Sequence, residues 1–113
     1  MTTRKLEKKM WRTFFDRMSK VLDARQAEIE VAALPLGAQV QARHLPLLGV
    51  VYDPKSDAIE VALQGLDHLI RKPREIYVDN DITGLAALEI VDGEGVKQIV
   101  RFREPLMLPA PQH

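Results

Sequence analysis

Residues 85–102, LAALEIVDGEGVKQIVRF, contain the pattern that decides the fold. Apolar residues alternate with polar ones on both sides of a glycine-containing segment, as in two antiparallel strands joined by a short loop. A three-residue loop, Gly93-Glu94-Gly95, would pair Asp92 with Val96. It would place five apolar residues on one face: Leu88, Ile90, Val96, Val100 and Phe102. A two-residue loop would split that set, so we predict the longer loop, with Gly95 in the left-handed conformation.

The same period of two extends outward through residues 26–104. Residues 47–63 predict a second hairpin, with turn residues at 52–57 and a nearly continuous apolar run at 47–52. We expect that run to be buried on both faces, as in a central strand. Residues 75–79, EIYVD, predict one more short strand. In total we expect five or six mostly antiparallel strands, in a curled sheet or a small, partly open barrel.

Residues 5–24 have a different period and predict one amphipathic helix. Apolar residues recur there at spacings of three and four, and Trp11 and Phe15 widen the stripe. The stripe consists of Leu6, Met10, Phe14, Met18, Val21 and Leu22. An apolar helix face needs a sheet to cover it, so we expect the stripe to pack in the core. The fold class is therefore α+β, a single domain over residues 1–113, with a proline-rich extended tail at 105–113.

Composition limits the classes of function. The 113 residues carry no formal net charge, which argues against a dedicated nucleic-acid binder. Residues 1–25 hold eight Lys/Arg and three Asp/Glu, a net of +5, and the remainder balances them. With no cysteine, disulfides and thiolate chemistry are excluded. No apolar leader or membrane-length span is visible, so we expect a cytoplasmic protein.

Residues 65–76, GLDHLIRKPREI, contain the strongest candidate for a binding site. In one interpretation Asp67 orients His68, while Arg71 and Arg74 bind an anion, with His44 as a helper. In the other, which we favour, residues 66–70 form a short helical turn between strands, whose apolar side chains plug a barrel end. Adjacent residues project in different directions from a helix, which weakens the Asp67–His68 pair.

Two further features have structural explanations that we prefer, and a third leaves a weak binding function open. In the alternating pattern, His44 falls on the same face as its apolar neighbours. We therefore predict that it is a hydrogen-bonded histidine at the edge of the core. Residues 79–84, DNDITG, match the start of a calcium loop, but Ile90 stands where a bidentate Glu is required, so we expect a turn and no metal site. Basic residues on the predicted helix could bind nucleic acid or an anionic membrane weakly: Lys5, Lys8, Lys9 and Arg12.

Residues 45–79, LPLLGVVYDPKSDAIEVALQGLDHLIRKPREIYVD, and the ending VRFREPLMLPAP give a resemblance over nearly the whole chain. In these stretches the sequence resembles a family of small bacterial proteins known only as a domain of unknown function. The resemblance implies a bacterial, single-domain protein, and it implies no activity, cofactor or catalytic residue.

The sequence leaves three functions open. The first is a non-enzymatic domain that acts through protein contacts as a homo-oligomer, because strand edges need pairing or covering. The second is a small-molecule or anion-binding protein, with or without enzyme activity, that uses residues 65–76. The third is the weak binding of nucleic acid or membrane by the basic residues.

Overall fold

The computed structural model describes residues 2–22, 26–33, 37–82 and 84–107. Two short helical segments follow the first strand: η1 (Lys8–Met10) and α1 (Trp11–Lys20). Eight strands make up the rest: β1 (Thr2–Leu6), β2 (Gln26–Ala33), β3 (Gly37–Asp53), β4 (Ala58–Leu63), β5 (Leu66–Arg71), β6 (Glu75–Asp81), β7 (Gly84–Val91) and β8 (Lys97–Leu106).

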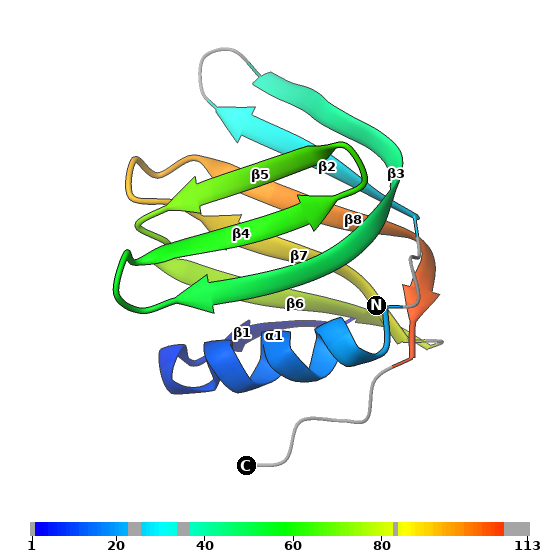
Figure 1. The fold of residues 1–113 in the computed structure, drawn as a ribbon, viewed down its shortest axis with the longest axis horizontal. Coiled ribbons are helices and arrows are strands. Elements are labelled where there is room, and N and C mark those ends of the chain that lie inside the picture. Colours follow the sequence, from blue (N-terminus) through cyan, green and yellow to red (C-terminus); the bar gives the residue numbers. More distant parts are fainter. Residues whose placement is uncertain (1, 23–25, 34–36, 83, 108–113) are drawn as a thin grey trace.

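The strands form one antiparallel sheet in the order β1-β6-β7-β8-β2-β3-β4-β5. The long strand β3 pairs with β2 through its first half and with β4 through its second half. The sheet bends along β3, so that β3, β4 and β5 form a front layer over a back layer of β6, β7 and β8 (Figure 1). It is a curled sheet with two ends, β1 and β5, rather than a closed barrel.

The hairpin at residues 85–102 has the predicted register. Leu88 pairs with Val100, and the backbone N–H of Asp92 donates to the carbonyl of Val96 at 2.9 Å. Gly95 has a φ of +81°, as the three-residue loop requires. The apolar residues at 88, 90, 100 and 102 are buried, which confirms the predicted face.

The predicted helix over residues 5–24 is wrong at both ends: α1 ends at Lys20, Val21 is exposed, and residues 23 and 24 lie outside the described part of the chain. Residues 2–6 form β1, which pairs with β6 from Thr2 opposite Asn80 to Leu6 opposite Ile76. A distant strand thus overrides the local period, as tertiary context often does. The helix proper begins at Trp11 and buries four side chains: Trp11, Phe14, Phe15 and Met18.

Residues 66–71 also differ from the favoured prediction. They form β5, paired with β4 from Leu63 opposite Leu66 to Ala58 opposite Arg71, where we expected a helical turn. Gly65, with φ +80°, sits in the two-residue turn between these strands. With β1 and β5 included, the sheet has eight strands rather than five or six.

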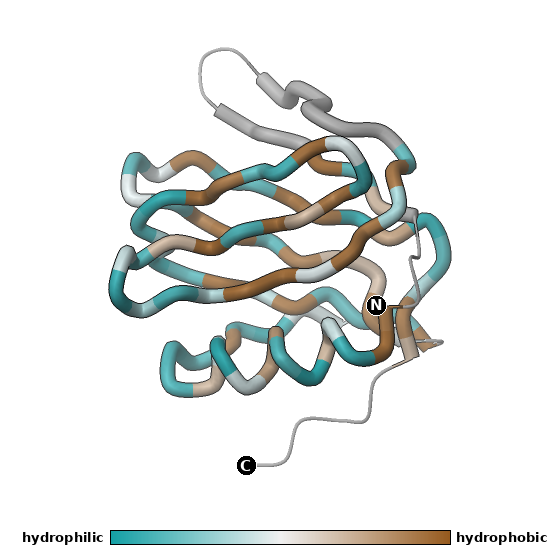
Figure 2. Tube along the Cα trace, viewed as in Figure 1, coloured by the Kyte–Doolittle hydropathy of each residue, from teal (hydrophilic) through white to brown (hydrophobic). Residues whose placement is uncertain are grey.

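The core fills the space between the layers and α1. Along β4 and the second half of β3, buried and exposed side chains alternate. Figure 2 shows the hydropathy of the residues along these strands. The run at 47–52 is therefore buried on one face only, because Leu48 and Val51 are exposed. Of the predicted tail, Pro105 and Leu106 belong to β8, and residues 108–113 lie outside the described part of the chain.

Helix α1 covers an edge of the front layer, along the bottom of Figure 1. Ser19 Oγ accepts from the N–H of Val50 and donates to its carbonyl, both at 3.0 Å. Trp11 packs edge-on against Tyr52, with ring centroids 5.2 Å apart, and its Nε1 donates to the Leu6 carbonyl at 2.9 Å. The second half of β3, which has β4 on one side only, is thus held by the helix on the other.

Candidate functional site

Strand β5 ends the front layer, and its outer edge has no neighbouring strand among the residues that the structure describes. The N–H of Lys72 donates to the Asp57 carbonyl at 2.8 Å. This bond shows which facing residues of β4 and β5 form hydrogen-bonded pairs. Since hydrogen-bonded pairs alternate in antiparallel strands, His68 and Ile70 point their backbone groups at β4. Leu69 and its neighbours two residues away point theirs at the free edge.

A chain of three polar side chains joins this edge to the back layer. His68 extends from β5 toward β8, where its Nε2 meets the Oε1 of Gln98 at 2.5 Å. Gln98 is 8% exposed, and its Nε2 donates to Asp92 Oδ2 at 2.9 Å. Asp92 Oδ1 in turn accepts from the N–H groups of Glu94 and Val96, which shapes the β7–β8 loop. Because an amide oxygen only accepts, the His68 Nε2 carries the proton.

A hollow of about 420 Å³ lies beside this chain, between the end of β5 and the β7–β8 loop. Arg71 and Lys72 line it from one side, and Asp92, Glu94 and Gln98 line it from the other. The Gly93 N–H also reaches the Arg71 carbonyl at 3.4 Å, so the loop touches the strand at this point. Two cations and two carboxylates face the same space, which leaves it without a net charge.

The structure separates the other predicted site residues from this hollow. Asp67 lies next to His68 on a strand, so the two side chains project to opposite faces and form no dyad. Arg74 is exposed, and its backbone N–H donates to the Val91 carbonyl at 2.8 Å. His44 is exposed in β3 at φ 52°, rather than at the edge of the core as predicted. Of the predicted set, Arg71 lines the hollow, and His68 is hydrogen-bonded to Gln98 on its wall.

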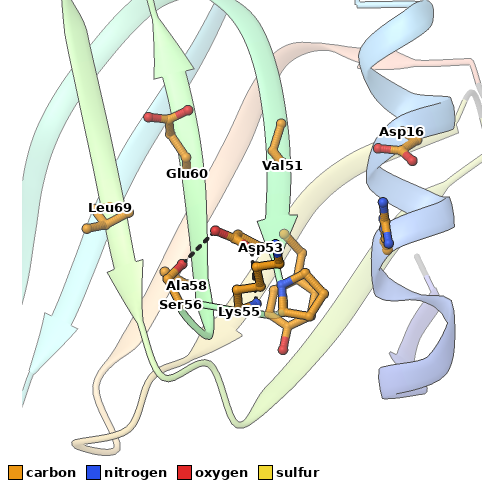
Figure 3. Close-up of a pocket in the computed structure, with 11 residues that line it drawn as sticks. Asp16, Val51, Asp53, Lys55, Ser56, Ala58, Glu60 and Leu69 are labelled. Carbon is orange, nitrogen blue, oxygen red and sulfur yellow. Dashed lines mark hydrogen bonds between the residues drawn. The ribbon is translucent and has the colours of Figure 1, made fainter.

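A larger groove, of about 690 Å³, lies on the outer face of the front layer (Figure 3). Val51, Glu60 and Leu69 stand in one cross-strand row from β3 through β4 to β5. The groove reaches from this row to the β3–β4 turn on one side and to Arg12 and Asp16 of α1 on the other. Val51 is 49% exposed, and Leu48, also in β3, is 57% exposed. Leu69 in β5 is 45% exposed. The floor is therefore partly apolar, and its rim is charged.

The β3–β4 turn at one end of the groove is held by its own side chains. Asp53 accepts from the Lys55 N–H and from the Ser56 hydroxyl, both at 3.0 Å, as drawn in Figure 3. These hydrogen bonds hold the pKa of Asp53 below its ordinary value. The Tyr52 hydroxyl donates to Asp57 at 3.0 Å, and burial, followed by this bond, raises the pKa of Tyr52. The turn is thus a fixed wall of the groove.

A pair of carboxyl groups sits on the back layer. Thr3 Oγ1 of β1 donates to the buried Asp79 at 2.6 Å, and Asp79 shares a hydrogen bond with Glu89. That bond, followed by burial, raises the pKa of Glu89, although Lys97 lies 3.2 Å away. Asp79 therefore has a structural role in fixing β1. The Gly84 N–H donates to Asp81 at 3.0 Å in a turn, and the part of the chain that the structure describes contains no cluster suited to a metal ion.

The predicted basic face is divided among three elements. Lys5 lies in β1 and pairs with Glu75 at 3.4 Å, whereas Lys8 and Lys9 lie in η1. Lys8 stands 5.7 Å from the Trp11 ring centroid, and Lys9 pairs with Glu7 at 3.4 Å. Arg12, in α1, lines the groove. No single helix face presents these four cations together.

Sequence reasoning missed Gln98 and the exposed apolar residues. In the alternating pattern of this strand, Gln98 falls on the same inward face as Val96 and Val100. A polar residue on an otherwise apolar face was the sequence feature that could have pointed to it. Val51 and Leu48 were hidden within a continuous apolar run, whose pattern does not separate the two faces. Across the described parts of the chain, no helix has the length and apolar character needed to cross a bilayer.

Comparisons with known proteins find matches over nearly the whole chain. A model of a "Family of unknown function (DUF5335)" matches residues 2–111. An "Uncharacterized protein" of Aquifex aeolicus (strain VF5) is 39% identical over 110 residues, which cover 96% of this chain and 99% of the relative. No solved structure matches the chain. The resemblance seen in the sequence is thereby confirmed, and the chain belongs to the DUF5335 family of unknown function.

Proposed function

We propose that the protein is a non-enzymatic interaction domain that works by protein–protein contact, with a second copy of the chain as its partner. The observation that carries this proposal is the outer face of the front layer. Three large apolar side chains are exposed there or beside it: Leu48, Val51 and Leu69. They accompany a strand edge that no other strand of the sheet covers.

Both features favour contact with protein. An apolar centre within a charged rim is the usual composition of an interface between proteins. Here Val51 and Leu69 supply the apolar side chains, on either side of the exposed Glu60. The rim includes Arg12, Asp16 and Lys55. An open edge strand offers unpaired N–H and C=O groups, which proteins either protect or use for association.

The proposal is tested by the solution mass of the purified chain over a wide concentration range, measured by sedimentation velocity. We expect a mass that rises from one chain to two. The variant Leu69→Lys should remain monomeric, because it places a cation in the apolar centre. The matched control Ile82→Lys changes an apolar residue that is fully exposed in the β6–β7 turn and should self-associate like the natural chain. A strictly monomeric natural chain would contradict the proposal.

Anion binding is the second candidate, because Arg71 and Lys72 line one hollow beside His68. Asp92 and Glu94 face the same space and weaken its attraction for anions. Titration with inorganic phosphate, followed by NMR of the His68 ring, tests this candidate. Saturable shifts at His68 but not at the exposed His44 would support it, and equal or absent shifts would remove it.

A further inference from the structure

We infer that two copies of the chain pair through their β5 strands, antiparallel and centred on Leu69. This inference rests on the proposed function, because it supplies the geometry of the self-association. The pairing would join two front layers of three strands into one continuous sheet. Three features of β5 support this pairing: its backbone, its charges and its outer face.

The backbone of β5 has the phase that such pairing needs. Asp67, Leu69 and Arg71 direct their N–H and C=O groups away from β4, as the alternation of the β4–β5 ladder requires. A two-fold axis at Leu69 opposes Leu69 to its copy and Asp67 to the copy of Arg71. Leu69 and its copy would then exchange both backbone hydrogen bonds, and each Asp67 carbonyl would accept from the Arg71 N–H of the other copy. The Gly93 N–H already touches the Arg71 carbonyl, so the paired segment ends at residue 71.

The charges of β5 are complementary to themselves in this register. Asp67 and Arg71 lie two positions to either side of Leu69, and all three side chains are exposed on the same face. Each Asp67 would therefore stand directly opposite an Arg71 of the other copy, twice per dimer. Opposite charges at directly facing positions stabilise a strand pair, and like charges destabilise it. A register shifted by two residues would oppose Leu69 to a charged residue and lose both pairs.

The outer face of the joined sheet would also be continuous. The row Val51–Glu60–Leu69 of one copy would meet the same row of the other at the two Leu69 side chains. The two exposed leucines would then cover each other. Each groove borders on Leu69, so the two grooves would open onto the same axis.

A single cysteine tests this geometry, because the natural chain has none. Facing residues of a hydrogen-bonded antiparallel pair have Cα atoms about 5.5 Å apart, within the range that a disulfide spans. Leu69→Cys should therefore form a covalent dimer rapidly under mild oxidation. Val51→Cys is the matched control: at ~4.8 Å per strand, its two copies would lie roughly 24 Å apart and should not link.

Charge exchange gives an independent test without cysteine. Asp67→Arg and Arg71→Asp should each weaken self-association by roughly 10-fold, because each places like charges opposite one another twice. The double variant Asp67→Arg/Arg71→Asp restores opposite charges in the same register and should regain the affinity of the natural chain. Circular dichroism of each variant verifies that it is folded before its mass is interpreted.

The outcomes separate this inference from the proposed function. Cross-linking at residue 69 together with rescue by the double variant supports the β5 register. Self-association that is indifferent to the charge exchange and gives no residue-69 link would overturn the register and leave the interaction domain standing. A natural chain that stays monomeric at all concentrations would overturn both.

Discussion

The front layer has two edges that the fold treats differently. On one side, α1 lies along β3, and a single hydroxyl, that of Ser19, bonds to both backbone groups of Val50. On the other side, the outer edge of β5 has no neighbouring strand in the described part of the chain. Two hydrogen bonds tie β5 to the back layer: His68 to Gln98, and the Gly93 N–H to the Arg71 carbonyl. The helix thus covers the first edge, whereas the second is held in place without a covering strand.

This difference explains why an amphipathic helix occurs in a protein that is otherwise a sheet. The helix buries Trp11, Phe15 and Met18 fully, and it thereby closes the space between the layers on the β3 side. An uncovered edge strand is a hazard that natural proteins usually protect. The chain has one α-helix in its described part, and it lies at the edge opposite β5.

The largest effect is expected where the helix meets the covered edge. Trp11→Ala removes a fully buried ring that packs on Tyr52 and bonds to the Leu6 carbonyl. We expect the free energy of unfolding to fall by about 3–5 kcal/mol, measured by urea denaturation. Trp11→Phe is the control, because it keeps most of the ring packing and should lose clearly less. Equal losses for the two variants would mean that the indole hydrogen bond, rather than packing, holds the helix.

The second prediction concerns the hydroxyl that closes the covered edge. Ser19→Ala leaves the N–H and carbonyl of Val50 without their partner, and we expect a loss of about 1–3 kcal/mol in unfolding free energy. Hydrogen exchange at the Val50 amide should accelerate more than exchange at neighbouring amides. Ser56→Ala, in the exposed β3–β4 turn, is the matched control and should cost less. An unchanged exchange rate at Val50 would show that water replaces the hydroxyl without penalty.

The third prediction concerns the open edge, where we expect a smaller loss. Gln98→Ala removes the side chain that joins His68 to Asp92, and the unfolding free energy should fall by about 1 kcal/mol. Water can reach His68, which is partly exposed, so its ring need not remain unpaired. The observable is backbone exchange along β5, which should accelerate while exchange along β3 stays as it was. Equal acceleration of exchange in β5 and β3 would contradict the interpretation that the two edges of the front layer are stabilised independently.

The smallest effect is expected at β1, the other end of the sheet. At β1, Asp79 holds Thr3 and shares a hydrogen bond with Glu89, whose pKa is raised. A raised pKa means that the folded state binds the proton more tightly than the unfolded state. Its stabilising contribution is therefore complete at acidic pH, below the unfolded pKa, and is lost as the pH rises through the folded one.

Glu89→Gln keeps the neutral form at every pH. This variant should therefore have a slightly larger free energy of unfolding than the natural chain at neutral pH. The difference should shrink as the pH falls through the acidic range. Thermal unfolding at a series of pH values measures this trend, and Glu60→Gln controls for the removal of one negative charge. A gain that does not depend on pH would show that the shared carboxyl pair has no part in it.

The sequence predicted those parts of the fold in which local pattern and tertiary partner agree. The hairpin around Gly93–Gly95 came out in the correct register, because its turn chemistry and its apolar face both require the same pairing. Residues 2–6 were misassigned, since their spacing suits a helix, and only the distant strand β6 makes them a strand. Residues 66–71 were misassigned for a similar reason: their partner is β4, and the charged residues there concealed the period of two.

The candidate site was predictable only in part. His68 and Arg71 were found from residue type, and they do lie near one hollow. Gln98, the hydrogen-bond partner of His68, is thirty positions away in the sequence, and no motif connects the two residues. The exposure of Leu48 and Val51 depends on which face of β3 meets the core, and a continuous apolar run does not determine that.

The position of β8 has a consequence for synthesis of the chain. Near its C-terminal end the chain supplies the strand that enters between β7 and β2, opposite residues made some seventy positions earlier. A chain emerging from a ribosome can form the local β3–β4–β5 meander well before that strand arrives. Until then β2 lacks its neighbour β8 and His68 lacks Gln98, and pairing across such sequence separations is slow. The unpaired strand edges are thus open to premature contact between neighbouring nascent chains before β8 arrives.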